Sequence, residues 1–369
     1  PAEDVPAGSI THAEQLLNFE DNAGKLMRRV PKCADALPKP GGFIMIMSSH
    51  TGSTAMMSQL VQHPSIKFDL PTMEPLNTFD FEEEDPWSAA DWADDFFKRN
   101  GNDLSGRISG FKMSSVTVIK APERFKKLVK DYNLRILWNY RLNIFKKAIG
   151  RYPYYYLNDN STVGGINASQ EDDRCSMGVG CNYTVKDAKD LHCVMVRTKR
   201  VDDYMEKAVK ILTEDHGCYL ELPYEDYVRY PSDQMNQIYD FLGIERQLLD
   251  AKRGKATSDN MCEVIDNFAE MCAAFNGCSA WSWMLNDEEN GCSCDKYSYE
   301  SLGSDETNTF CQTARPEGYL RWCGGFNYEE DVERIKELQA KGAEAMSDFK
   351  KQKLGSTDAQ VREPTIITN

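Results

Sequence analysis

The sequence has no long hydrophobic run and a shortage of positive charge. No stretch of its 369 residues approaches the ~20 apolar residues that a membrane span requires. Its 58 acidic residues outnumber 43 basic ones, which gives a formal net charge of −15. Because phosphate backbones and anionic lipids are bound mainly by clustered lysine and arginine, we expect neither nucleic acid nor an anionic membrane as a partner. A small anionic ligand remains compatible, since one pocket can be basic on an acidic protein.

Two common functional motifs are also missing. The segment FIMIMSSHTGSTAMMSQL (43–60) lacks the leading glycine and the lysine of G-x-x-x-x-G-K-[ST], so an ordinary ATP or GTP loop is not indicated. Zinc-ligand spacing is absent as well, because Cys292 and Cys294 form a lone C-x-C pair with no nearby histidine. The sequence therefore predicts no metal cofactor.

Cysteine, in contrast, is abundant. Of 12 cysteines, seven lie between Cys262 and Cys323, and N-glycosylation sequons occur at Asn160, Asn167 and Asn182. Together they favour a disulfide-bonded glycoprotein in the lumen of the secretory pathway (Golgi) or outside the cell. The alternative is a cytoplasmic protein with free thiols and chance sequons. The sequence does not determine which cysteines form disulfides with each other. Because the cluster holds seven cysteines, an odd number, at least one is free or pairs with a cysteine outside the cluster.

The amino-terminal residue is Pro1 rather than methionine. We expect that an upstream signal peptide or membrane anchor was removed. Contact with a membrane would then depend only on such an anchor.

Apolar runs and helix-like segments alternate through the middle of the chain. The pattern predicts strands at 43–47, 107–113 and 134–140, and a fourth strand that runs into a turn within 218–227. It predicts helices at 54–63, 122–132, 141–152, 185–215 and 232–244, the last capped by Ser232 and closed by Gly243. This order indicates an α/β protein, a P-loop-like three-layer fold with a central parallel sheet flanked by helices.

Composition divides the chain into four parts. We expect an N-terminal extension (1–40), a main α/β domain (41–285), a Cys-rich, disulfide-stapled appendage (286–325), and a C-terminal helix and tail (326–369). The acidic stretch 77–103 is typical of a solvated face, although its two tryptophans, Trp87 and Trp92, could instead line an acceptor site.

The loop between the first strand and helix is typical of a phosphate-binding turn. A helix N-terminus offers unpaired N–H groups and the positive end of the helix dipole. Gly52 allows close approach of the backbone, and Thr51, Ser53 and Thr54 add hydroxyl donors. The simpler alternative is an ordinary strand-to-helix turn.

Four segments, in order, resemble the sulfotransferases that use 3′-phosphoadenosine 5′-phosphosulfate (PAPS), especially carbohydrate and bacterial members. SSHTGST (48–54) resembles their 5′-phosphosulfate loop, and ILWNYRLNIFKKAIGRY (136–152) is similar to their 3′-phosphate segment. YLELPYEDYVRYPSDQMNQIYDFLGIE (219–245) closely matches a shared stretch, and KATSDNMCEVIDNFAEMCAAFNG (255–277) looks like their closing element.

The resemblance implies roles for individual residues. PAPS binding would fall to Ser49, His50, Thr51, Gly52, Ser53, Thr54, Arg141, Gly150 and Lys255. Catalysis would fall to Glu74 as the base, with His63 as its rival, and to His50 or Lys112 as the cation at the leaving oxygen. Tyr224, Glu225 and Asp226 would instead anchor neighbouring backbone.

Two positions depart from the family pattern. His50 replaces a lysine or arginine, and Gly150 replaces a serine that would contact the 3′-phosphate. A protonated His50 could still stabilise the leaving oxygen; otherwise Lys112 would take that role. Lys146, Lys147 and Arg151 could compensate for the lost serine.

We therefore expect sulfuryl transfer from PAPS to a hydroxyl of a carbohydrate or glycoconjugate, leaving adenosine 3′,5′-bisphosphate, with no metal. The acidic 80–95 stretch leaves a neutral or cationic small-molecule acceptor as an alternative. A second alternative is a catalytically decayed, sulfotransferase-like nucleotide-binding protein. A P-loop kinase of small alcohols is disfavoured by the missing lysine.

Overall fold

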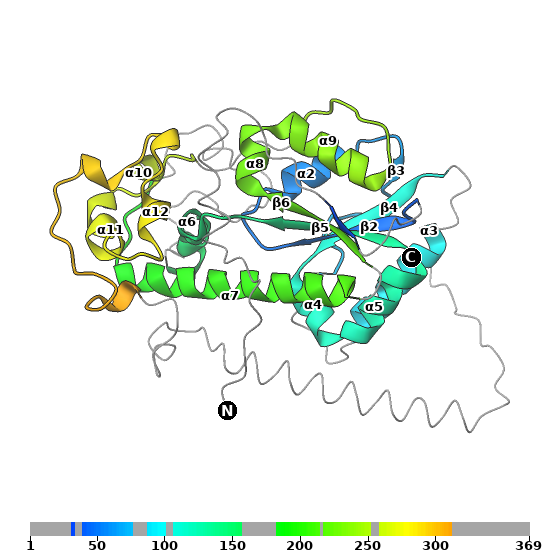
Figure 1. The fold of residues 1–369 in the computed structure, drawn as a ribbon, viewed down its shortest axis with the longest axis horizontal. Coiled ribbons are helices and arrows are strands. Elements are labelled where there is room, and N and C mark those ends of the chain that lie inside the picture. The colour runs from blue at the N-terminus through cyan, green and yellow to red at the C-terminus, as the bar shows by residue number, and fades with distance from the viewer. Residues whose placement is uncertain are drawn as a thin grey trace, which may run out of the picture.

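The computed structural model describes residues 31–33, 39–76, 87–100, 106–156, 182–214, 217–251 and 258–311. Within them, six strands form one sheet in the order β1-β6-β5-β2-β4-β3 (Figure 1). Five are parallel, and β1 pairs with β6 in the antiparallel sense at one edge. The strands are β1 (Lys32–Cys33), β2 (Gly42–Met47), β3 (Ile66–Lys67), β4 (Ile108–Met113), β5 (Leu134–Tyr140) and β6 (Cys218–Pro223).

Helices cover both faces of the sheet (Figure 1). Every residue of β2 and β4 is buried, as continuous apolar strands require when both faces are covered. One face carries α2 (Ser53–Leu60), α8 (Tyr224–Arg229) and α9 (Pro231–Leu242). The other carries α3 (Ser88–Asn100), α4 (Ser115–Lys120), α5 (Pro122–Asp131) and α7 (Ala188–Thr213). The predicted α/β class with a central parallel sheet is therefore confirmed.

The strand order brings several loops to one edge of the sheet. β2 lies between β4 and β5, and its last residue, Met47, pairs with Asn139 of β5. Since parallel strands end at the same edge, the segments that follow β2, β4, β5 and β6 meet there. The candidate site is built from these segments.

A separate hydrophobic cluster lies beside the sheet and includes the cysteine-rich segment. This cluster joins α6 and the first half of α7 to residues 261–311. The cluster contains α6 (Ile144–Tyr156), α10 (Met261–Val264), α11 (Phe268–Phe275) and α12 (Ser282–Leu285). Three short 3-10 helices follow at Glu288–Asn290, Cys294–Lys296 and Thr309–Cys311.

Three disulfides staple this segment: Cys262–Cys292, Cys272–Cys294 and Cys278–Cys311. The prediction of disulfides in the C-terminal region is confirmed. Each bond joins a cysteine before residue 285 to one after it, so the predicted appendage is tied to the chain that precedes it. Six of the seven clustered cysteines pair among themselves; the seventh, Cys323, lies outside the described residues. The bonds fit an oxidising environment.

Some local predictions were wrong. The expected turn after β6 is helix α8, and α9 begins at Pro231 with Tyr230 as its N-cap rather than Ser232. Proline suits the first turn of a helix because its missing N–H has no partner there. The predicted C-terminal helix and tail lie outside the described residues. In the described part of the chain, no helix is both long and apolar enough to cross a membrane.

The stretch predicted as a solvated acidic face contains the amphipathic helix α3. Its buried side includes Ala93 and Phe96, while acidic residues face outward. Trp92 stacks on Phe96 and meets the edge of Phe111 on β4. These contacts place Trp92 against the hydrophobic core.

Candidate functional site

The β2–α2 loop has an unusual backbone. His50 and Gly52 both adopt positive φ, at 62° and 70°, on either side of Thr51. A non-glycine residue in the left-handed region is strained and is held only by its surroundings. At position 52, a Cβ would also lie 2.7 Å from the ring of Tyr224. Glycine is therefore required there for both conformation and space.

No side chain caps helix α2 at its Gly52 N-terminus. The Ala55 N–H donates to the Gly52 carbonyl oxygen at 3.0 Å, so Ser53 and Thr54 carry the N–H groups that can face an anion, and the positive end of the helix dipole lies at the loop. Thr51 donates from Oγ1 to the Ser48 carbonyl oxygen at 2.8 Å, which closes the loop on itself. The turn has the backbone geometry that the prediction of an anion-binding loop requires.

Lys112 of β4 brings the loop and Glu74 together. Its Nζ donates to Thr54 Oγ1 at 2.7 Å and lies 3.3 Å from Ser53 Oγ. The same ammonium forms an ion pair with Glu74 Oε1 at 2.5 Å. Lys112 is 2% exposed and the Glu74 side chain is 27% exposed, so the cation is buried beneath a partly accessible carboxylate. Sequence analysis named all four residues, and the structure brings them into one cluster.

Arg141 directly follows β5, the strand that flanks β2 on the side opposite β4. Its Nη1 donates to the His50 carbonyl oxygen at 3.4 Å, and its guanidinium sits 4.3 Å from the ring centroid of Tyr224. Glu225 and Asp259 approach it at 3.9 and 3.6 Å. Burial lowers the pKa of Arg141, but a guanidinium stays charged in proteins.

Tyr224 was predicted to be structural, and its ring contacts both halves of the site. One face meets Arg141, and the ring also closes against Gly52. Glu225 accepts hydrogen bonds from the backbone N–H groups of Leu142 and Asn143, both at 3.0 Å. Glu225 therefore anchors backbone, as the sequence indicated, and fixes the turn that carries Arg141.

The two departures from the family pattern lie against each other. A Cβ at Gly150 would be 2.9 Å from His50 Nδ1, so the glycine makes room for the imidazole. Desolvation and repulsion by Arg151, Arg141 and Lys147 lower the pKa of His50 to about 4. The His50 side chain is exposed, so repulsion by the three cations outweighs desolvation as the cause. The lowered pKa favours the neutral imidazole at pH 7, whereas Lys112 is ion-paired with the Glu74 carboxylate.

The other basic residues near the loop have partners. Lys146 forms an ion pair with Asp287, and Lys147 forms one with Asp202. Arg151 Nη2 lies 3.4 Å from Ser49 Oγ, on the exposed side of the loop. Lys255, predicted to bind PAPS, lies outside the described residues.

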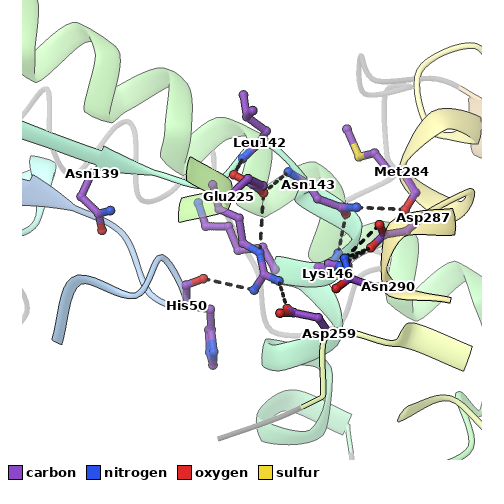
Figure 2. Close-up of polar contacts among 12 residues, drawn as sticks. His50, Asn139, Leu142, Asn143, Lys146, Glu225, Asp259, Met284, Asp287 and Asn290 are labelled. Atoms are coloured by element: carbon purple, nitrogen blue, oxygen red, sulfur yellow. Dashed lines mark hydrogen bonds and ion pairs between the residues drawn. The ribbon is translucent and has the colours of Figure 1, made fainter. Parts of the chain in front are cut away.

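A pocket of about 320 Å³ opens beside Arg141. That volume falls within the ~300–1,000 Å³ typical of ligand pockets. The cysteine-rich segment supplies its far wall: Asn143 Nδ2 donates to the Met284 carbonyl oxygen at 2.9 Å, and Lys146 pairs with Asp287 (Figure 2). Sequence analysis missed this wall, because it is assembled by tertiary contacts and carries no motif.

His63, the rival base, has a structural role. Its Nδ1 accepts from the Ser65 backbone N–H at 3.1 Å, so Nε2 donates to the Glu245 carbonyl oxygen at 2.7 Å. The residue is 1% exposed and cannot reach a substrate. Among the residues that the structure describes, no cluster of His, Cys, Asp or Glu is arranged to hold a metal ion.

Comparisons with known proteins give structural likeness only. No family model matches the chain, and no curated protein sequence matches it. Its structure is similar to a sulfotransferase from Alicyclobacillus acidocaldarius, with a TM-score of 0.36 and 16% identity over 68% of this chain and 94% of the other. It is similar to the sulfotransferase domain of the curacin biosynthetic pathway, with a TM-score of 0.34 and 14% identity over 61% and 82%. The corresponding values for the sulfotransferase domain of the Synechococcus PCC 7002 olefin synthase are 0.32, 17%, 61% and 82%.

Proposed function

We propose that this protein is a PAPS-dependent sulfotransferase that sulfates a hydroxyl group of a carbohydrate or glycoconjugate. The observation that carries the proposal is the position of Lys112, which contacts two hydroxyls of the loop and the Glu74 carboxylate through one ammonium. A buried cation between an anion-binding turn and a carboxylate suits transfer of an anionic group to an acceptor that must lose a proton.

The loop residues would hold the 5′-phosphosulfate. N–H groups at the start of α2 and the hydroxyls of Thr51, Ser53 and Thr54 are suitable donors. PAPS supplies the sulfuryl group, whose bond to the bridging phosphate oxygen breaks as the acceptor oxygen bonds to sulfur. Lys112 would neutralise charge that develops on the leaving oxygen, and Glu74 would take the proton of the acceptor hydroxyl. Catalysis would then consist of positioning and electrostatic stabilisation.

Arg141 would bind the far end of the nucleotide. Its planar guanidinium can engage a phosphate through two hydrogen bonds, and it already lies at the edge of the pocket described above. The pocket would receive the nucleoside. The neighbouring carboxylates Glu225 and Asp259 hold the guanidinium in place through long ion pairs, which a phosphate could replace.

The experiment is an acceptor panel with sulfate-labelled PAPS, comparing wild type with Glu74→Gln. We expect labelled product from at least one sugar hydroxyl and a turnover loss of about 10²–10⁴-fold in the variant, with donor binding kept. Glu206→Gln, which removes an exposed carboxylate paired with Lys210 on α7, is the matched control and should turn over normally.

Other outcomes decide between the alternatives. If labelled product forms only with neutral or cationic small molecules, the acceptor is a small molecule of that kind and not a carbohydrate. Binding of adenosine 3′,5′-bisphosphate without turnover would indicate a decayed enzyme. An unchanged rate in Glu74→Gln would remove Glu74 as the base.

We further propose a luminal (Golgi) or secreted location and N-glycosylation. The three disulfides support an oxidising compartment, and Asn182 is exposed, with its side-chain amide 2.6 Å from Asp266 Oδ1. The other two sequons, at Asn160 and Asn167, lie outside the described residues. Protein expressed through the secretory pathway should lose mass on deglycosylation, and Asn182→Gln should lose one glycan.

A further inference from the structure

An ion pair behind the β2–α2 loop is not used by the proposed chemistry. Lys147 of α6 is buried and pairs with Asp202, which lies in the middle of α7 and whose side chain is 16% exposed. Burying a charge is costly and is offset only by good geometry and further hydrogen bonds. A pair of this kind at a candidate anion site therefore calls for an explanation.

The second contact of Asp202 provides one. Ser48 Oγ donates to Asp202 Oδ1 at 3.3 Å, and the Ser48 carbonyl oxygen accepts from Thr51 Oγ1 at 2.8 Å. Ser48 and Thr51 are 5% and 0% exposed. Two hydrogen bonds, one from the Ser48 hydroxyl and one to the Ser48 backbone carbonyl, thus link helix α7 to Thr51. Thr51 is the residue between the two left-handed positions of the loop.

The packing of the surrounding elements makes this link rigid. Helices α6 and α7 share the hydrophobic cluster that includes Ala148 and Leu191, so Lys147 and Asp202 come from elements fixed relative to each other. Burial raises the pKa of Asp202, while Lys147, Ser48 and Lys199 oppose the rise. Lys147 pairing therefore favours the ionised carboxylate, the form that accepts from Ser48.

We infer that Asp202 is a positioning residue that holds the anion-binding loop in its strained conformation through Ser48. Lys147 keeps the Asp202 carboxylate ionised, and Asp202 fixes the loop segment on which donor binding depends. This inference rests on the proposed donor-binding role of the loop. It adds a residue that belongs to none of the segments that resemble the sulfotransferases.

The test compares single and double variants by calorimetric titration with adenosine 3′,5′-bisphosphate. Asp202→Asn should weaken binding by roughly 10-fold, the effect expected from losing one hydrogen bond to a charged group. Ser48→Ala removes only the hydrogen bond and should weaken binding in the same direction. The double variant should be no weaker than Asp202→Asn alone, because both changes break the same link. With PAPS, KM should rise more than kcat falls.

The neighbouring residue supplies the control. Asp203 pairs with Lys199 on the exposed side of the same helix, so Asp203→Asn should bind as wild type does. If Asp202→Asn does not fold, the Ser48→Ala variant, which changes no charge, tests the inference by itself. Wild-type affinity in Ser48→Ala, or additive losses in the double variant, would overturn the inference. Failure of wild type to bind the bisphosphate would instead overturn the proposed function.

Discussion

The two sides of the Gly52 turn differ in how they are built. On the β4 side, one buried ammonium, Lys112, contacts two loop hydroxyls and a partly exposed carboxylate. On the β5 side, Arg141 contacts a loop carbonyl, an aromatic ring and two carboxylates at long range. The first side has a carboxylate and a cation in contact, the arrangement that the proposed proton transfer and charge stabilisation require. The second has a cation beside a pocket with two long ion pairs, an arrangement suited to the proposed reversible binding.

This difference predicts that the Lys112 side serves the chemical step and the Arg141 side serves nucleotide binding. If this prediction is correct, changes on the Lys112 side lower kcat, while changes on the Arg141 side raise the Kd of the bisphosphate. The predictions below are ordered by the size of the expected effect.

The largest expected effect is that of Lys112→Met, which should slow the chemical step. Loss of one preorganised charge at the leaving oxygen should lower kcat by about 10²–10³-fold. Single-turnover rates with labelled PAPS measure the effect. Lys67→Met on β3, which removes a surface pair with Asp69, is the control. A kcat within twofold of wild type in Lys112→Met would contradict the assignment.

Arg141→Lys should act mainly on affinity. It keeps the charge but removes the planar fork that matches phosphate, and also the stacking on Tyr224. We expect the Kd of adenosine 3′,5′-bisphosphate to rise by about 10-fold, with kcat at saturating PAPS little changed. A large fall in kcat with unchanged Kd would reverse the roles of the two sides.

Removal of Cys262–Cys292 should affect the Arg141 side alone. This bond holds the segment that forms the pocket wall, and the residues that line the pocket include Arg141 but not Lys112 or Glu74. The double Cys262→Ser/Cys292→Ser variant should lose about 2–4 kcal/mol of unfolding free energy. Its Kd for the bisphosphate should rise several-fold while single-turnover chemistry is retained. Equal loss on both sides would show that the two sides are not independent.

The smallest expected effect concerns His50. Its pKa falls from 6.5 when unfolded to about 4 in the folded protein, so between these pH values the unfolded state binds more protons. The unfolding free energy should therefore rise with pH through this window, and the contribution is lost as pH falls towards 4. Subtracting the pH profile of His50→Gln from that of wild type isolates this slope. A zero or negative difference would show that the imidazole is not repelled by its cationic neighbours.

Local patterns predicted the fold well. The apolar run at 43–47 followed by Gly52 identified the strand, the loop and the helix, because burial and helix-terminus chemistry are local signals. Helix α3 was missed because Asp91, Asp94 and Asp95 conceal the helical spacing of its buried alanines and phenylalanines.

The site was predictable in part. Glu74 and Arg141 could be named from their resemblance to motif positions, and Lys112 as a stand-in for the cation that His50 replaces; their assembly follows from strand order. The fit of Gly150 to His50 could not be predicted, because the two residues come from different elements. Asp202 gave no signal either, since a single aspartate on a polar helix face normally contacts water.

Titration of adenosine 3′,5′-bisphosphate into wild type and Gly52→Ala tests the central claim most directly. Alanine at this position must adopt φ near +70°, with its Cβ against the Tyr224 ring, and should deform the turn. We predict one-to-one binding to wild type and loss of that binding in a Gly52→Ala protein that remains folded by circular dichroism. No binding to wild type, or equal binding to both proteins, would contradict the account.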